Sequence, residues 1–283
     1  MTGYREENKL IMDKNAPIGV FDSGVGGLTV AREIMRQIPN ERIVYFGDTA
    51  RAPYGSKSKD NIIKFSRQII RFLQTENVKA IVIACNTASA LALDEMQQEF
   101  DLPILGVVKP GAKVAVETTA NKRIGLIGTE ANIRSGVYTR YIKSLDDEAK
   151  VFEKACPLFV PLVEEGWLHD DITLQVASRY LEELKEKDID TLIMGCTHYP
   201  LIRSTIRKVM GDKVNLVNPA YETAIELKNL LERDNLANKC DVDSPSSMYR
   251  FYVSDAEEKF KLFANSILPF DITMTKQINI EKI

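Results

Sequence analysis

Two cysteines of the chain, Cys85 and Cys196, lie at positions in the sequence where a thiol can take part in catalysis. Each ends a short apolar run and is followed by polar residues, Asn86-Thr87 in one case and Thr197-His198 in the other. Such apolar runs are typical of buried parallel strands, so both thiols are predicted on strand-to-helix turns. Ligands of open α/β sheets bind at these turns, where unpaired helix N–H groups also lower the pKa of a thiol. We therefore expect two reactive thiols in comparable positions.

Two thiols that face each other across a cleft can catalyse a racemisation. One sulfur removes the Cα proton of an amino acid while the other delivers a proton to the opposite face. Thiol pKa values lie close enough to neutrality for each sulfur to act in either form. The reaction needs a site that excludes water and stabilises carbanion character with fixed dipoles. We expect an anionic substrate, because nearby side chains can donate hydrogen bonds to carboxylates: Ser23, Asn86, Thr87 and Thr197.

A glycine-rich turn provides a second feature of a binding site. Residues 22–27 read Asp-Ser-Gly-Val-Gly-Gly between an apolar run and a helical pattern, and their bare amides can hold an anion. A plain tight turn explains the same residues. The sequence contains neither GxGxxG nor GxxxxGK[ST], so it does not support binding of a dinucleotide or a nucleoside triphosphate. Asp48 and the pair Tyr54-Gly55 follow another apolar run and are candidates for the same site.

One of the two histidines, His198, lies two residues after Cys196. This spacing is compatible with a Cys-His nucleophile pair, a proton relay or half of a metal site. A metal is disfavoured because a Cys-x-His unit does not supply the further ligands that zinc needs. His169 is predicted at the surface or in packing, and Glu164 and Glu165 as solvated charges that close a helix.

The other candidate nucleophiles have weaker settings. Ser23 and Ser89 lie in turns, but neither has the G-x-S-x-G elbow of a serine triad. Cys156 precedes a proline and Cys240 lies in a polar stretch, and we predict both to be structural. The absence of a CxxC pair disfavours a thiol redox enzyme.

Alternating strands and helices must position these residues. Apolar runs rich in Val and Ile are separated by segments with helical spacing of apolar residues, as over 31–38 and 62–73. This alternation predicts a buried parallel sheet flanked by helices, which is the α/β class. The predicted strands are 18–21, 43–46, 80–84, 104–107, 123–127, 191–194, 214–217 and 249–253, and a helix is predicted over 256–267.

The chain also repeats itself, at an offset of roughly 110 residues. The run from Ile18 is echoed from Ile124, and the turn at Cys85 is echoed at Cys196. Two matches at nearly one offset predict two similar α/β domains with the site in the cleft between them. We predict a flexible extension over 1–14, a first domain over 15–108 plus 219–283, and a second domain over 109–218. A loop is predicted over 233–247.

Composition disfavours several classes of function. The 283 residues carry 37 Lys and Arg against 40 Asp and Glu, a net charge of −3, with no basic block suited to nucleic acid. The charged N-terminus does not resemble a signal peptide, and the apolar runs are too short to span a bilayer. We expect a cytoplasmic protein with neither nucleic acid nor membrane as a partner.

Several ordered motifs occur together in this chain. They are Phe21-Asp-Ser-Gly-Val-Gly-Gly-Leu-Thr29, Phe46-Gly-Asp48, Pro53-Tyr-Gly55, Ala84-Cys-Asn-Thr-Ala88, Pro161-Leu-Val-Glu-Glu-Gly166 and Gly195-Cys-Thr-His-Tyr-Pro200. With these motifs the sequence resembles the glutamate racemases, which belong to the aspartate/glutamate racemase superfamily, over nearly its whole length. The resemblance implies two α/β domains, interconversion of L- and D-glutamate without a cofactor or metal, and supply of D-glutamate for bacterial peptidoglycan. A homodimer is expected on the same ground.

The resemblance also implies roles for individual residues. Cys85 and Cys196 would be the paired proton donor and acceptor, with Asp22 assisting on the Cys85 side and His198 on the Cys196 side. Asp48 and Glu164 would have supporting roles, with Glu165 as the alternative to Glu164. The substrate would be held by Asp22-Ser23, Tyr54-Gly55, Asn86-Thr87 and Thr197-His198.

Three other functions stay open at this point. A different substrate of the superfamily, such as aspartate or a hydantoin, is one. A two-domain protein that binds an amino acid without turning it over, with the cysteines in packing roles, is another. The thiol redox enzyme is the third, and a test of turnover without cofactor separates an enzyme from a binder.

Overall fold

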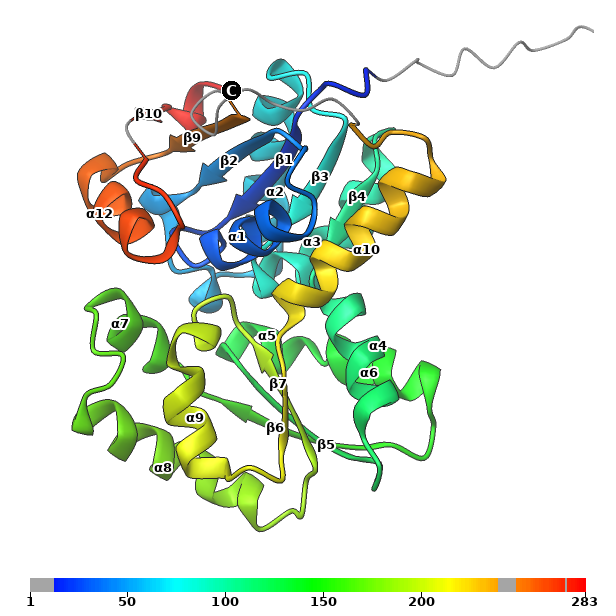
Figure 1. Ribbon diagram of the computed structural model, residues 1–283, viewed down its shortest axis with the longest axis vertical. Helices are drawn as coiled ribbons and strands as arrows, with labels where there is room; N and C mark the ends of the chain where they lie inside the picture. Colours follow the sequence, from blue (N-terminus) through cyan, green and yellow to red (C-terminus); the bar gives the residue numbers. More distant parts are fainter. Residues whose placement is uncertain (1–12, 239–247, 273) are drawn as a thin grey trace, which may run out of the picture.

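Two parallel sheets organise the part of the chain that the computed structural model describes, residues 13–238, 248–272 and 274–283. The larger sheet has the strand order β10-β9-β2-β1-β3-β4 and the smaller one β6-β5-β7-β8 (Figure 1). We call the unit built on the larger sheet the first unit and the other the second unit. The strands are β1 Ile18–Asp22, β2 Ile43–Gly47, β3 Ala80–Ile83, β4 Ile104–Gly106, β5 Arg123–Gly128, β6 Lys150–Ala155, β7 Thr191–Gly195, β8 Asn215–Val217, β9 Tyr249–Val253 and β10 Thr275–Gln277.

The central strands are parallel, and both of their faces are covered. Every residue of β1, β2, β3 and β7 is buried. In register, Ile18 of β1 lies between Ile43 of β2 and Ala80 of β3. A sheet that is buried on both sides requires continuous apolar strands rather than alternating ones. The carboxyl ends of these strands therefore lie together at one edge of each sheet.

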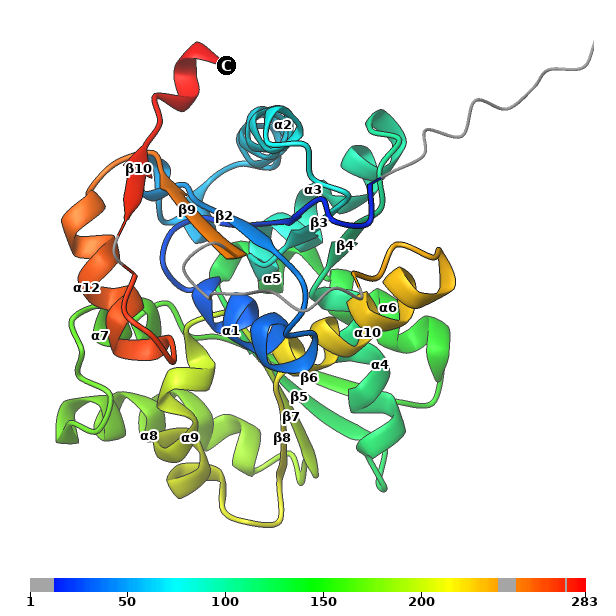
Figure 2. The same ribbon diagram turned by 45° about the horizontal axis from the view of Figure 1, so that its top comes forward.

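Helices cover both faces of each sheet. They are α1 Leu28–Gln37, α2 Lys59–Thr75, α3 Asn86–Glu99, α4 Val108–Thr118, α5 Glu130–Ser135, α6 Val137–Leu145, α7 Phe159–Glu164, α8 Asp171–Lys185, α9 Arg203–Met210, α10 Pro219–Arg233 and α12 Glu257–Ile267. Helices α1, α10 and α12 pack on one face of the larger sheet, and α2 and α3 pack on the other (Figure 2). Helices α7, α8 and α9 cover one face of the smaller sheet, and α4 and α6 cover the other.

The chain crosses between the two units twice. Strand β4 of the first unit leads into α4 of the second, and β8 of the second leads into α10 of the first. The two crossings pack against each other, since a Cβ on Gly111 would lie 2.9 Å from the Pro219 ring. The α/β class and the pair of parallel sheets flanked by helices are confirmed.

The predicted strands and the helix over 256–267 are confirmed to within one residue at each end. Two edge strands, β6 and β10, were not predicted. Residues of β6 are mostly half-buried and include three charged side chains, so the strand has no continuous apolar run. Helix α10 continues to Arg233, which places the first residue of the predicted loop in a helix. Residues 239–247 of that loop and 1–12 of the predicted extension lie outside the described residues.

None of the helices in the described ranges is long and apolar enough to cross a membrane.

Candidate active site

A small cavity lies where the carboxyl ends of strands from both sheets meet. Its volume is about 30 Å³, and side chains of both units form its walls. The first unit contributes the turns after β1 and β3 and the loop after β2, and the second unit contributes the turns after β5 and β7. Its lining residues are Ser23, Gly24, Ala52, Pro53, Tyr54, Gly55, Cys85, Asn86, Thr87, Thr129, Val160, Glu164, Cys196, Thr197 and His198.

Cys85 reaches the cavity from the first unit. It is the residue that precedes α3, and its thiol donates a hydrogen bond to the Ser23 hydroxyl, with 3.7 Å between Sγ and Oγ. Burial, with a smaller effect of the negative Asp22, raises the pKa of Cys85 to about 12. The expectation that the helix N-terminus lowers the pKa of this thiol is therefore wrong, because desolvation outweighs the N–H groups. Cys85 is a thiol at neutral pH.

Cys196 reaches the cavity from the second unit, directly after β7. Its Sγ lies 3.7 Å from Nδ1 of His198, and Nε2 of that ring lies 3.1 Å from Oε1 of Glu164. Burial alone would lower the pKa of His198. Hydrogen bonds to Cys196 and Glu164, together with the charges of Cys196 and Asp22, outweigh burial and raise this pKa to about 10. His198 is thus an imidazolium between a sulfur and a carboxylate.

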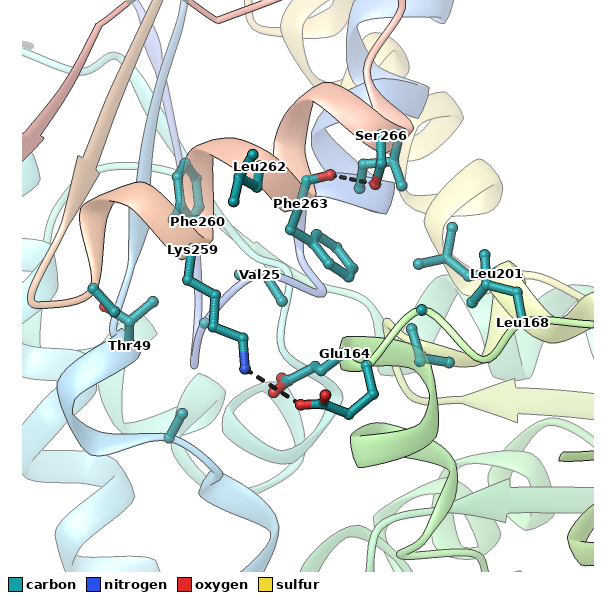
Figure 3. Close-up of a pocket in the computed structure, with 17 residues that line it drawn as sticks. Val25, Thr49, Glu164, Leu168, Leu201, Lys259, Phe260, Leu262, Phe263 and Ser266 are labelled. Carbon is teal, nitrogen blue, oxygen red and sulfur yellow. Dashed lines mark hydrogen bonds and ion pairs between the residues drawn. The ribbon is translucent and has the colours of Figure 1, made fainter. Parts of the chain in front are cut away.

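The structure distinguishes between the two adjacent glutamates. The hydrogen bond to His198, opposed by burial, lowers the pKa of Glu164, so this carboxylate is charged. Glu165 has a side chain 66% exposed and lies 3.7 Å from Lys259 of α12. Figure 3 shows Lys259 reaching from α12 toward the end of α7, where Glu164 lies. The prediction of a solvated charge is confirmed for Glu165 and is wrong for Glu164.

The pocket in Figure 3 adjoins the small cavity. It has a volume of about 560 Å³ and shares Gly24, Ala52 and Glu164 with the cavity. Its other walls come mainly from α12 and from the segment around α7. Glu164 therefore borders both the larger outer pocket and the cavity that the two sulfurs line.

Asp22 lies behind the cavity wall. Its side chain is fully buried. It accepts one hydrogen bond from the Gly24 amide at 3.0 Å and another from the Thr197 hydroxyl at 3.5 Å. Burial raises the pKa of Asp22, while the positive His198 lowers it. Asp22 is not one of the residues that line the cavity. The carboxyl group thus ties the turn after β1 to the turn after β7.

Asp48 is also buried and holds the loop after β2. It accepts hydrogen bonds from the Tyr54 hydroxyl, from Nε of Arg51 at 2.7 Å and from the Ser254 hydroxyl at 2.9 Å. Tyr54 and the adjacent Gly55 line the cavity, whereas Asp48 does not. Asp48 therefore supports the wall that these two residues form.

The remaining candidates for substrate contact come together as the sequence analysis predicted. Ser23, Asn86, Thr87 and Thr197 all line the cavity. Hydrogen bonds between the units fix two of the turns: the hydroxyls of Thr87 and Thr129 are 2.9 Å apart, and the Thr29 hydroxyl donates to the Thr197 carbonyl at 2.9 Å.

Gly24 belongs to the glycine-rich turn that the sequence analysis proposed as an anion-binding feature, whereas sequence reasoning did not single out Ala52, Pro53, Thr129 or Val160 as cavity residues. Thr129 follows β5, the strand that repeats β1, so its position in the repeat was a usable signal. Val160 carried no such signal, because it is an apolar residue of the short helix α7.

The residues predicted to be structural lie away from the cavity. Cys156 is fully buried, and His169 is exposed, with its ring 3.4 Å from the Ser204 hydroxyl. Ser89 is buried and accepts the Val108 amide at 3.4 Å. Cys240 lies outside the described residues. Within the described part of the chain, no group of three or more His, Cys, Asp and Glu side chains is arranged to hold a metal ion.

Comparisons with known proteins identify relatives of this chain. The model of the Asp/Glu/Hydantoin racemase family matches residues 18–225. The chain is 43% identical to the glutamate racemase of Oceanobacillus iheyensis, over 95% of this chain and 98% of that protein. It is 47% identical to the glutamate racemase of Nostoc sp., over 87% of this chain and 82% of that protein.

Solved structures extend the comparison to the fold. A glutamate racemase isoform from Bacillus anthracis superposes with a TM-score of 0.89 at 39% identity, covering 94% of this chain and 98% of that one. The glutamate racemase of Francisella tularensis, in complex with D-glutamate, gives a TM-score of 0.88 at 38% identity, covering 95% and 100%. The aspartate racemase of Picrophilus torridus has a TM-score of 0.57 at 16% identity, which shows a shared fold alone.

Proposed function

The chain belongs to the Asp/Glu/Hydantoin racemase family and is an amino-acid racemase, and from this premise we propose that it interconverts L- and D-glutamate by a two-base mechanism. The observation that carries the proposal is the pair of sulfurs, Cys85 from one unit and Cys196 from the other, on the walls of one small cavity. Sulfurs on opposite walls can serve opposite faces of one Cα atom.

The different surroundings of the two sulfurs support different roles, acid and base, before the substrate binds. Cys85 carries its proton, because burial raises its pKa to about 12. Cys196 lies 3.7 Å from Nδ1 of the His198 imidazolium, a group that can exchange a proton with it. We therefore assign Cys85 as the acid and Cys196 as the base before the substrate binds.

The proton transfers balance without any other reactant. The thiolate takes the Cα proton and becomes a thiol, and the electron pair of the C–H bond stays on the substrate as carbanion character. The thiol on the opposite face then gives its proton to Cα and becomes a thiolate. The enzyme returns to its first form when the two sulfurs exchange their protonation states through solvent or neighbouring groups.

The polar lining residues would hold the substrate through its carboxylates. Hydroxyls and amides of Ser23, Asn86, Thr87 and Thr197 donate to carboxylates, and Tyr54-Gly55 closes the wall nearby. His198 would assist Cys196, with Glu164 keeping the ring charged. Asp22 and Asp48 would act as supports behind the wall, since neither lines the cavity.

We also propose the domain boundaries 15–108 plus 219–283 and 109–218. The strands of the larger sheet all fall in the first set of residues and those of the smaller sheet in the second, which supports this division. Use of D-glutamate for bacterial peptidoglycan and a homodimeric assembly belong to the same proposal, on the ground of the family resemblance alone. A cytoplasmic location is proposed as well, on the ground of the composition.

The test is glutamate turnover by the purified protein without added cofactor. D-Glutamate should form from L-glutamate, measured by chiral chromatography. Cys85→Ala and Cys196→Ala should each lower the rate by roughly 10³-fold or more, because each removes an acid or base that the reaction needs. Circular dichroism of each variant should show an unchanged fold.

Cys156→Ala is the matched control, because Cys156 is a buried free thiol that does not line the cavity. This variant should keep its turnover. Full activity of either Cys85→Ala or Cys196→Ala would contradict the two-thiol mechanism. Binding of glutamate without turnover by the wild-type protein would favour the binding-protein alternative, and turnover of aspartate alone would favour the other substrate.

A further inference from the structure

A buried tyrosine of the second unit contacts a cavity residue of the first. Tyr138 lies on α6 and is 1% exposed. Its hydroxyl donates a hydrogen bond to Oδ1 of Asn86, the first residue of α3, with an O···O distance of 2.7 Å. The two residues are 52 positions apart in the sequence. The bond is thus a contact between the two units at the edge of the cavity.

The tyrosine hydroxyl is a donor in this setting. Burial, together with the negative charge of Cys196, raises the pKa of Tyr138 far above its ordinary value. The group therefore carries its proton at neutral pH. A phenol that donates its proton to an amide group donates it to the amide oxygen. The amide nitrogen is a hydrogen-bond donor and has no free lone pair to accept the proton.

The bond to Tyr138 determines which end of the Asn86 amide is free. Oδ1 is occupied by the tyrosine hydroxyl, while within the described ranges no acceptor of the protein bonds to Nδ2. Asn86 lines the cavity directly beside Cys85. An amide NH₂ group donates two hydrogen bonds and attracts carboxylates, whereas an amide oxygen repels them. The orientation of this amide therefore decides whether Asn86 binds or repels an anionic substrate.

We propose that Tyr138 is a positioning residue that holds the Asn86 amide with its N–H donors toward a carboxylate of the substrate. This inference rests on the proposed function, because it takes an amino-acid dicarboxylate as the ligand. It assigns to α6 of the second unit a part in substrate binding at the first unit. The contact exists only while the units are together, so it couples the closed arrangement of the units to a correctly oriented donor.

Tyr138→Phe tests the proposal. Without the hydroxyl, the Asn86 amide is free to rotate by half a turn and present its oxygen to the carboxylate. The Kd for D-glutamate, measured by calorimetry, and the KM for both enantiomers should rise about tenfold, the effect of losing one hydrogen bond to a charged group. The kcat should change by no more than about twofold, because the contact is equally strong before and during the proton transfers.

A second background shows whether Tyr138 acts through Asn86. Asn86→Ala should itself raise Kd and KM, and adding Tyr138→Phe to it should then have no further effect. Tyr252→Phe is the matched control, since it removes a tyrosine hydroxyl that bonds to Glu76 at 3.0 Å and lies outside the cavity lining. This control should leave Kd and KM unchanged.

The results distinguish the inference from the proposed function. An unchanged Kd in Tyr138→Phe, or an equal loss of affinity in the Asn86→Ala background, would overturn the role of Tyr138 while leaving racemisation intact. A fall in kcat at constant KM would indicate a structural role and would also overturn it. A wild-type protein that binds glutamate but does not racemise it would contradict the proposed function, and the Kd values would still test Tyr138.

Discussion

His198 makes the two sulfurs of the cavity chemically unequal. Its ring bridges Cys196 and Glu164, and its pKa is raised to about 10 although burial opposes this. Cys85 has a hydroxyl as its side-chain partner instead of a cation. The residue pattern Cys-x-His predicted the first pairing, whereas the partner on the other side of the ring, Glu164, depends on how α7 packs.

Glu164→Gln should shift the pH dependence of the reaction. Removing the carboxylate takes away a partner that raises the pKa of His198, so the imidazolium loses its proton at lower pH. In the wild type, kcat/KM should fall on the alkaline side as pH rises toward about 10. In Glu164→Gln this fall should begin at a clearly lower pH. A full pH profile of kcat/KM provides the measurement.

Glu165→Gln is the control for this prediction, because Glu165 is exposed and pairs with Lys259 rather than with His198. Its profile should match that of the wild type. Equal profiles for all three proteins would contradict the role of Glu164. The raised pKa of His198 also affects the stability of the fold. Its stabilising contribution to folding is complete below the ordinary histidine pKa of 6.5 and is lost as pH rises through about 10.

The reactivity of the thiols could be predicted from the sequence only in part. The residues around Cys85 and Cys196 locate both on strand-to-helix turns, and this is confirmed. The pKa of Cys85 could not be predicted, because it depends on how completely distant segments bury the sulfur. Burial is a property of the packed chain, and the local pattern contains only the opposing effect of the helix N-terminus.

At the scale of elements, the turns at the carboxyl ends of the strands position the residues of the cavity. The turn after β1 packs directly on the turn after β7, so that a Cβ on Gly26 would lie 2.4 Å from Oγ1 of Thr197 and 2.5 Å from Cε1 of His198. The Thr29 hydroxyl bonds to the Thr197 carbonyl in the same interface. The glycine is needed here for close approach of the two units.

Gly26→Ala should therefore lower turnover with little effect on the fold. The added methyl group displaces His198 and Thr197 from the cavity wall, and a displacement of about 1 Å at a catalytic group costs roughly 100-fold in rate. Steady-state kinetics and thermal unfolding are the two measurements. Unchanged activity of Gly26→Ala would contradict the need for close approach at Gly26.

The strands at the centre of each sheet and the edge strands β4 and β8 could be predicted from sequence, whereas the edge strands β6 and β10 could not. Strands such as β3 are buried throughout and therefore read as continuous apolar runs. Strands β6 and β10 lie at the edges of their sheets, where one side of the strand has no neighbour and the residues are partly solvated. An edge strand needs no apolar run, so the pattern that identifies a strand is absent.

At the scale of the whole molecule, the site exists only because the two units meet. Neither sheet holds both sulfurs, and hydrogen bonds join the units around the cavity: Thr29 with Thr197, Asp22 with Thr197, Thr87 with Thr129, and Asn86 with Tyr138. The internal repeat of the sequence predicted two units and a cleft between them. The individual contacts could not be predicted, because Thr129 and Tyr138 reach the site only through the packing of one unit on the other.

The size of the cavity has a consequence for how the substrate binds. Its volume of about 30 Å³ is room for roughly two water molecules by the same measure. Glutamate is larger than this space, so the walls of the cavity must rearrange to admit it. The closed arrangement excludes water from the two sulfurs, which favours transfer of a proton from a very weak carbon acid.

The central claim is that each unit supplies one sulfur for one face of Cα. The most direct test is an early-time reaction of L-glutamate in D₂O, with deuterium at Cα of both enantiomers measured by mass spectrometry after chiral separation. The account predicts that the D-glutamate formed carries deuterium from the start, while the remaining L-glutamate keeps its proton at low conversion. D-Glutamate that retains the original proton would show that one base serves both faces, and would contradict the account.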